Sequence, residues 1–198
     1  MLAILIRGHG TKARGSWQPG ASADLDGDGV VEQEARLVPR YLAEAYRVLA
    51  AADHEVEVYA TGSYESREAH ALEVASLVPG ARVGYVQAHC NAGGGDYGLI
   101  GWRTQSPASQ ALADRIAAAL RAACPELAGV RSVDANAEAW PRMYRILVGI
   151  PLGSGIAAVC YEPCFVDCPA HRPLLAPEGL ARIGQALARG LGLWGETP

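Results

Sequence analysis

The sequence lacks any apolar run of the roughly 18 to 20 residues that a membrane-spanning helix needs. It also lacks a basic stripe or a cationic tail, and its formal net charge is -4. Arg7 and Gly8 follow the apolar residues 2–6 at once, without the charged start and the small-residue cleavage site of a signal peptide. These absences argue against membrane insertion and against nucleic acid as a partner. They predict a chain that is made in the cytoplasm in soluble form.

Closely paired cysteines are also missing. The five cysteines are an odd number, and none of them forms the CxxC pair that is typical of zinc and iron–sulfur sites. Cys160, Cys164 and Cys168 lie near one another, whereas Cys90 and Cys124 stand far apart. This is not the spacing of a secreted disulfide framework. We expect reduced, mostly buried thiols, with a cysteine metal cluster as the alternative.

Strand-like and helix-like segments alternate along the 198 residues. The expected strands are residues 2–7, 55–60, 81–88, 97–102 and 157–163, and the expected helices are residues 34–52, 66–77, 107–124 and 177–193. Residues 10–31 and 125–155 are rich in loop signals. The alternation predicts an α/β fold: a single-domain, three-layer sandwich over residues 1–198, with a mostly parallel or mixed central sheet and helices on both faces.

Three polar residues stand where apolar strands end. His9 follows LAILIRG, His89 follows RVGYVQA, and Glu162 closes the strand AAVCYE. Because active groups collect where the strands of an α/β sheet end, we expect these side chains at one edge of the sheet. Each could also be an ordinary hydrogen-bonded structural residue. Two imidazoles at one edge can hold a zinc ion, and zinc would make this chain a hydrolase.

The same segments resemble the zinc-dependent N-acetylmuramoyl-L-alanine amidases of bacterial cell-wall hydrolases and phage endolysins. RGHG at 7–10 is similar to the family's GHGG, and VQAHCNAG at 86–93 is similar to its S-[IL]-H-x-N-A segment. AAVCYEPCFVDCPAHRPLL at 157–175 resembles its terminal PAVLVExGFxSNxxD segment. The resemblance covers essentially the whole chain in the expected order. It departs from the family at Thr11, where the family has glycine, and at Cys168, where the family has asparagine.

The resemblance implies that His9 and His89 are zinc ligands and that Glu162 is the catalytic glutamate. Two imidazoles and one carboxylate would leave zinc an open position for water. Glu162 would take the proton of the attacking water and return it to the leaving amine. The bond implied is the amide that joins the lactyl group of N-acetylmuramic acid to L-alanine of the stem peptide.

The family's third ligand is a glutamate at the start of the first long helix. The segment AAADHEV at 50–56 is similar to the family's xAAGYEV, and counting back from it places this ligand on Glu34. Pro39 would kink the helix or delay its start, because proline removes a hydrogen bond and clashes with the preceding turn. Glu32 is therefore the alternative ligand.

The stretch DLDGDG at 24–29 resembles the first half of a calcium-binding loop. It offers Asp24, Asp26 and Asp28 as oxygen ligands. An EF-hand loop needs a glutamate at its twelfth position, and that position counted from Asp24 is Ala35. A partial calcium site and a solvated acidic turn are both compatible with this pattern.

Two other functions are compatible with the sequence. One is a carboxypeptidase-like zinc peptidase, although such enzymes place their first two ligands as HxxE and the third residue after His9 is Lys12. The other is a non-catalytic, metal-binding wall module. Peptidoglycan is the expected substrate, and no protein partner is evident. The expected route to the wall is release by phage-type lysis or a non-standard export.

Overall fold

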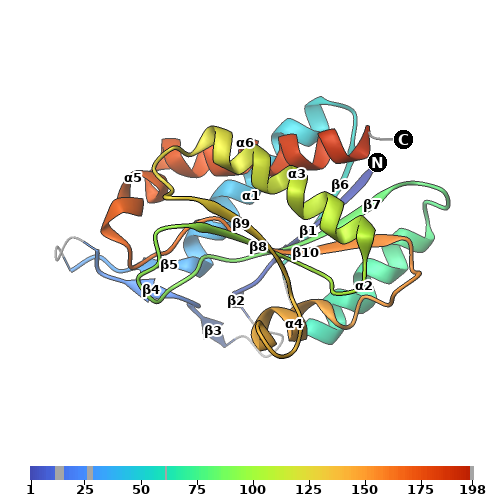
Figure 1. Ribbon diagram of the computed structural model, residues 1–198, viewed down its shortest axis with the longest axis horizontal. Coiled ribbons are helices and arrows are strands. Elements are labelled where there is room, and N and C mark those ends of the chain that lie inside the picture. Colours follow the sequence, from blue (N-terminus) through green and yellow to red (C-terminus); the bar gives the residue numbers. More distant parts are fainter. Residues whose placement is uncertain (12–15, 26–28, 61, 197–198) are drawn as a thin grey trace.

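The structure is a computed structural model, and it describes residues 1–11, 16–25, 29–60 and 62–196. Strands and helices alternate along these residues (Figure 1). The strands of the central sheet are β1 (Leu2–Arg7), β6 (Glu55–Tyr59), β7 (Val83–Ala88), β8 (Gly98–Trp102), β9 (Val130–Asp134) and β10 (Ile156–Glu162). The helices are α1 (Glu34–Ala51), α2 (Tyr64–Ser76), α3 (Pro107–Ala123), α4 (Pro141–Leu147), α5 (Arg172–Leu175) and α6 (Pro177–Gly195). A 3-10 turn, η1 (Pro169–His171), precedes α5.

The described residues form a six-stranded sheet in the order β6-β1-β7-β10-β8-β9. All neighbouring strands run parallel except β8 and β10, which are antiparallel. The central strands β1, β7 and β10 are buried along nearly their whole length, which explains their almost continuous apolar sequences. The predicted mixed sheet is confirmed.

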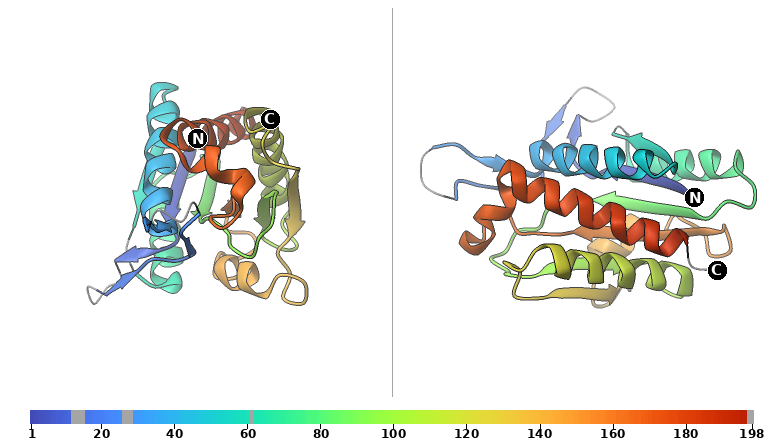
Figure 2. Two further views of the ribbon diagram at one scale, coloured as in Figure 1. Left: turned by 90° about the vertical axis from the view of Figure 1, so that its left-hand side faces the viewer. Right: turned by 90° about the horizontal axis from the view of Figure 1, so that it is seen from above.

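Helices cover both faces of this sheet, as the sequence predicted. One face packs against α1, α3 and α6 through strand residues such as Leu5, Val86 and Val159. The other face packs against α2 and α4 through Ile4, Tyr85 and their neighbours. Figure 2 shows α6 running between α1 and α3 along its face. Alternate strand residues thus belong to two different core layers, as the period of a strand requires.

The strands β1, β7 and β10 are adjacent and parallel, and their carboxyl ends are in register. Ala88 at the end of β7 pairs with Arg7 of β1 on one side and with Tyr161 of β10 on the other. The residues that directly follow these positions must therefore meet at one edge of the sheet. His9, His89 and Glu162 are among them.

The segments predicted to be loops contain regular structure, and that prediction was wrong in part. β9 and α4 both lie within residues 125–155, and α4 buries Met143, Ile146 and Leu147 against the sheet. A helix of seven residues is too short to display a helical period in the sequence. Residues 10–33 contain four two-residue strands that pair as two small ladders, β2 (Gly10–Thr11) with β3 (Trp17–Gln18) and β4 (Ser22–Ala23) with β5 (Glu32–Gln33).

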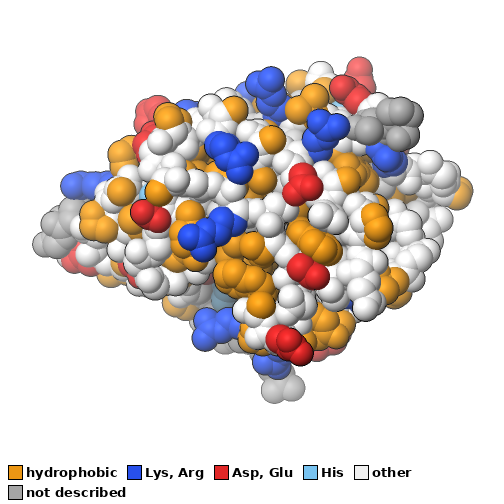
Figure 3. Space-filling view, in the orientation of Figure 1, with side chains coloured by type: hydrophobic (Ala, Val, Ile, Leu, Met, Phe, Trp, Pro, Cys, Tyr) orange, Lys and Arg blue, Asp and Glu red, His pale blue; other side chains and the backbone are white. Residues whose placement is uncertain are grey.

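The helix α1 begins at Glu34 and continues through Pro39, so Pro39 does not delay its start. Within the described residues, the longest helices are too short or too polar to cross a membrane. Basic and acidic side chains are interspersed on the face of the molecule shown in Figure 3. This mixed surface agrees with the absence of a basic stripe in the sequence.

Candidate metal centre and active site

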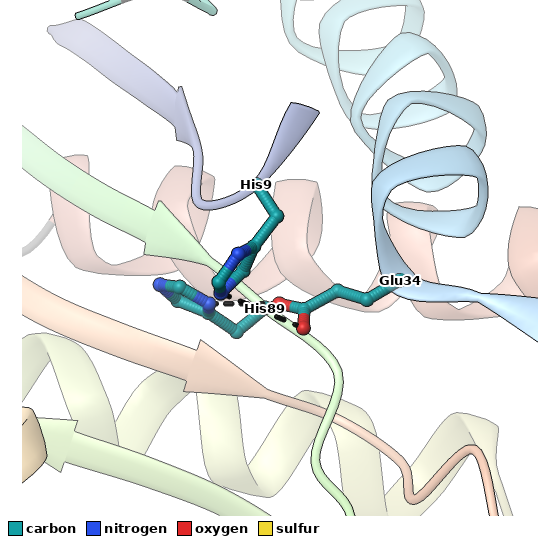
Figure 4. A group of neighbouring side chains, drawn as sticks. All are labelled: His9, Glu34 and His89. Atoms are coloured by element: carbon teal, nitrogen blue, oxygen red, sulfur yellow. Dashed lines mark hydrogen bonds and ion pairs between the residues drawn. The ribbon is translucent and has the colours of Figure 1, made fainter. Parts of the chain in front are cut away.

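The two strand-end histidines lie side by side. His9 leaves β1 and His89 leaves β7, and their ring centroids are 5.2 Å apart at an interplanar angle of 77° (Figure 4). The backbone at His89 is held on both sides: its N–H donates to Tyr161 O at 2.9 Å, and its carbonyl accepts from Tyr41 Oη at 2.8 Å. His89 is buried, whereas 21% of the His9 side chain is exposed. One face of the pair is therefore open to solvent.

Glu34 reaches both histidines from the first residue of α1. Its Oε1 lies 2.8 Å from His89 Nδ1, and its Oε2 lies 3.7 Å from His9 Nε2. The carboxylate also accepts from the backbone N–H of Ala21 at 2.8 Å and of Cys90 at 3.1 Å. One ligand atom from each of the three side chains lies within 4.8 Å of the others. This group can hold a metal ion.

Glu32, the alternative to Glu34, points elsewhere. It belongs to the ladder between β4 and β5, where it pairs with Ala23. Its carboxylate accepts from the backbone N–H of Leu25 at 3.4 Å. The structure therefore places Glu34, and not Glu32, beside the two histidines.

The turn at residues 19–21 positions the start of α1. Glu34 N–H donates to Ala21 O and Ala35 N–H donates to Pro19 O, both at 2.9 Å, so the turn satisfies two of the helix N–H groups that lack partners inside the helix. Gly20 has a φ of +72°, and a Cβ at this position would overlap the Glu34 carboxylate and lie 2.8 Å from His9 Cγ. Sequence reasoning missed Gly20, although a Pro-Gly pair is a turn signal.

Gly8 also lets the backbone lie close to one of the site's side chains. A Cβ at Gly8 would overlap the imidazole ring of His89. The backbone of the turn after β1 therefore lies against the His89 ring, and only glycine permits that approach. The carbonyl of Gly8 accepts from the buried Arg67 guanidinium at 2.9 Å, which fixes the turn from the side of α2.

Glu34 is buried and yet favours its charged form. Burial by itself would raise the pKa of Glu34, but the hydrogen bond with His89, electrostatic interactions with His89 and His9, and the N–H of Ala21 outweigh it. The pKa consequently lies below the ordinary value of 4.5. His89 Nε2 is buried and has no hydrogen-bond partner among the described residues. A buried, unsatisfied ring nitrogen beside an ionised carboxylate matches a set of metal donors.

Glu162 lies at the end of β10, near this group. Its Oε2 accepts from Asn91 Nδ2 at 2.7 Å, and Asn91 follows His89 by two residues. Burial raises the pKa of Glu162; His89 and Arg142 oppose the rise, and the charge of Glu34 adds to it. The pKa of Glu162 is therefore raised and that of Glu34 is lowered, although both carboxylates border the same cavity.

A cavity of about 580 Å³ connects these groups. It is lined by residues from the strand ends, the turn before α1, and the helices α2 and α4: His9, Gln18, Pro19, Gly20, Ala21, Glu34, Tyr64, His89, Cys90, Asn91, Ala92, Arg142, Arg145, Ile146 and Glu162. A second cavity of about 420 Å³ adjoins it and shares His9, Gln18 and Tyr64. Sequence reasoning missed the contribution of α4. The sequence signal that could have found it is Pro141, since proline is favoured at the first position of a helix.

The cysteines and the proposed calcium ligands do not form further metal sites among the described residues. All five cysteines are buried free thiols, as expected. Of the proposed calcium ligands, Asp26 and Asp28 lie outside the described residues, and Asp24 Oδ2 accepts from the backbone N–H of Gly29 at 3.1 Å. The one group of possible metal ligands found in the described part of the chain is His9, Glu34 and His89. The calcium prediction is therefore unsupported.

No family model matches the sequence, and no curated protein matches it either. Solved structures do match it. Cwp6 from Clostridium difficile has a TM-score of 0.73 at 16% identity, over 96% of this chain and 28% of Cwp6, so this chain spans a small part of that protein. The CwlD amidase from Clostridioides difficile, solved in complex with the GerS lipoprotein, has a TM-score of 0.68 at 16% identity, over 97% of both chains.

The N-acetylmuramoyl-L-alanine amidase AmiC2 of Nostoc punctiforme has a TM-score of 0.68 at 15% identity, over 98% of this chain and 96% of AmiC2. At such identities the likeness concerns the fold. The chain has the α/β fold of these amidases over nearly its whole length, as the resemblance implied. Because the CwlD structure includes a lipoprotein, the expected absence of a protein partner stays a prediction for this chain.

Proposed function

We propose that this chain is a zinc hydrolase that cleaves the amide bond between N-acetylmuramic acid and L-alanine in peptidoglycan, with residues 1–198 as its catalytic domain. The observation that carries the proposal is the convergence of His9, Glu34 and His89 within 4.8 Å at the sheet edge where β10 ends in Glu162. This edge belongs to a fold that is shared with N-acetylmuramoyl-L-alanine amidases.

His9, Glu34 and His89 would hold the zinc ion. Two imidazole nitrogens and one carboxylate oxygen are a known ligand set of catalytic zinc. The Glu34 carboxylate lies 2.8 Å from His89 Nδ1 and 3.7 Å from His9 Nε2, so the three side chains are close enough to share one ion. When bound, zinc supplies Lewis-acid chemistry, since it acidifies water and draws electron density from a carbonyl oxygen.

Glu162 is the proposed proton carrier. It accepts a proton from the water that attacks the amide carbon and then donates that proton to the nitrogen of the departing alanine. Its pKa is raised by burial, which makes the carboxylate a stronger base and brings its acid form closer to neutral pH. Asn91 donates to Oε2 of Glu162 at 2.7 Å, whereas Oε1 accepts a much longer hydrogen bond, of 4.0 Å, from the Cys160 thiol. Asn91 is thus the proposed positioning residue for the proton carrier.

The proposed site of action is the bacterial cell wall, where the substrate lies. No calcium ion is included in the proposal. A carboxypeptidase-like peptidase and a non-catalytic wall module are not favoured by a specific observation. The HxxE pair is missing from the sequence at His9, and Glu162 borders the same cavity as the metal ligands.

Digestion of purified peptidoglycan, followed by mass spectrometry of the products, tests the proposal. The zinc-loaded protein is expected to release stem peptides with a new N-terminal L-alanine. The Glu162→Gln variant keeps the shape of the side chain but removes its basic oxygen. It is expected to lose about 100-fold or more in rate while its zinc content stays unchanged.

Glu55→Gln is the matched control. Glu55 is an exposed glutamate at the opposite end of the sheet, and its variant should digest peptidoglycan at the rate of the unmodified protein. Products with new reducing sugar ends, or with cleavage inside the peptide, would contradict the assigned bond. Full activity of the Glu162→Gln variant would contradict the assigned proton carrier.

A further inference from the structure

Two arginines of α4 line the cavity that contains the metal centre. Arg142 and Arg145 are exposed and stand three residues apart, on one side of a helix whose Met143 and Leu147 are buried against the sheet. Side chains spaced by three residues lie about 5 to 6 Å apart at Cβ. The two guanidinium groups therefore form one basic wall of the cavity, which we call the α4 arginine pair.

The α4 arginine pair is not used by the fold. Within the part of the chain that the structure describes, no carboxylate forms an ion pair with Arg142 or Arg145. The two acidic residues of the same cavity have other partners: Glu34 is bonded to His89 and two backbone N–H groups, and Glu162 is bonded to Asn91. Two positive charges thus remain available to a ligand in the cavity.

Glu162 lines the same cavity as the pair. The charge of Arg142 lowers the pKa of Glu162, although burial has the larger, opposite effect. A group held by the α4 arginine pair would therefore share the cavity with the proposed proton carrier. Ile146, which also lines the cavity, provides an apolar surface next to the two charges.

We propose that the α4 arginine pair binds the free α-carboxylate of the acidic residue that follows L-alanine in the stem peptide. This inference rests on the proposed function. Guanidinium groups bind carboxylates through paired, charge-assisted hydrogen bonds, and a planar fork fits a carboxylate better than it fits an amide. L-alanine and the acidic residue together span at most about 7 Å of extended chain between the scissile nitrogen and that carboxylate, which is compatible with a cavity of about 580 Å³.

The consequence is a preference between two forms of the same substrate. N-acetylmuramoyl-L-alanyl-D-glutamate carries the free carboxylate, whereas N-acetylmuramoyl-L-alanyl-D-isoglutamine carries a neutral amide at that position. Hydrogen bonds to a charged group contribute about 1.5 to 3 kcal/mol, which corresponds to a preference of roughly 10-fold to 100-fold in kcat/KM. The unmodified protein is expected to favour the acid.

The test compares kcat/KM for these two substrates in the zinc-loaded protein and in the Arg142→Gln/Arg145→Gln double variant. The double variant is expected to bring the ratio between the two substrates close to one. Both side chains are exposed, so circular dichroism should show an unchanged fold. Arg115→Gln, at an exposed position of α3, is the control and should keep the preference of the unmodified protein.

The outcomes separate the two proposals. Equal cleavage of both substrates by the unmodified protein, or a preference that survives in the double variant, would overturn the arginine assignment and leave the amidase function standing. Cleavage of neither substrate by the zinc-loaded protein would refute the amidase function and this inference with it. A preference for the acid that the double variant loses supports both.

Discussion

At the scale of single residues, glycine matters in this site as much as the polar groups do. Gly20 and Gly8 each lie against a proposed ligand at a distance that leaves no room for a Cβ. Gly20 also has a left-handed φ of +72°, which L-residues with side chains adopt only at a cost of roughly 1 to 2 kcal/mol. The position of the Glu34 carboxylate therefore depends on a residue that has no side chain.

Replacing Gly20 with alanine tests this dependence. The Gly20→Ala variant is expected to lose stability through backbone strain and, in addition, to bind zinc at least about 10-fold more weakly, because the new methyl group displaces Glu34 and His9. Equilibrium dialysis with zinc, and urea unfolding of the metal-free protein, measure the two effects separately.

Gly80→Ala is the matched control. Gly80 has a similar φ of +83°, and nothing lies within 4 Å of the position where its Cβ would be. Gly80→Ala should show the loss of stability alone, with the zinc affinity of the unmodified protein. Equal zinc affinities in the two variants would show that the methyl group at residue 20 does not reach the ligands.

At the scale of elements, α1 contacts the proposed metal centre at two points. Its first residue supplies the Glu34 carboxylate, and two turns later Tyr41 donates its hydroxyl to the backbone carbonyl of His89 at 2.8 Å. Tyr41 is fully buried and stacks edge to face on Tyr161, with ring centroids 5.9 Å apart. This second contact holds the helix against the end of β7, where His89, one of the proposed ligands, lies.

Removing the Tyr41 hydroxyl should weaken this attachment. The Tyr41→Phe variant keeps the ring packing but leaves the carbonyl of His89 without a partner, which typically costs about 1 to 3 kcal/mol. Urea unfolding of the metal-free protein should show this loss of unfolding free energy. Tyr46→Phe on the same helix, where 47% of the residue is exposed, should show almost none. Equal losses of unfolding free energy in the two variants would show that the hydroxyl of Tyr41 contributes no more than that of an exposed tyrosine.

At the scale of the whole molecule, the proposed zinc ion would join elements that are distant in the sequence. Its ligands come from the ends of β1 and β7 and from the start of α1. The core beneath them consists of two apolar layers, one on each face of the sheet. We therefore expect the metal to add stability to a chain that folds without it.

Thermal unfolding with and without zinc measures this contribution. A ligand at 100 times its dissociation constant stabilises by about 2.7 kcal/mol. For a chain of this size that corresponds to a rise in Tm of roughly 5 to 10 °C. EDTA should reverse the rise, and the His89→Ala variant should not show it. An unchanged Tm in the unmodified protein, at zinc concentrations that restore activity, would argue against a site that bridges these elements.

Much of the fold was predictable because its determinants are local. The central strands are apolar on both faces, and α1 and α3 have strong helical spacing, so their positions follow from the order of residues. β9 was missed because its sequence, VRSVD, contains only two apolar residues, and α4 was missed because a seven-residue helix is too short to show a period. The small ladders before α1 were missed for the same reason.

The sequence by itself determined that His9, His89 and Glu162 follow apolar strands, and parallel strands in register bring such residues to one edge. Only the tertiary structure shows that Glu34, rather than Glu32, lies beside the two histidines, because this depends on where the turn at residues 19–21 lets the helix begin. The same holds for Gly20 and for the α4 arginine pair. Their roles depend on contacts between residues that are far apart in the sequence, and the order of residues does not show which distant residues come into contact.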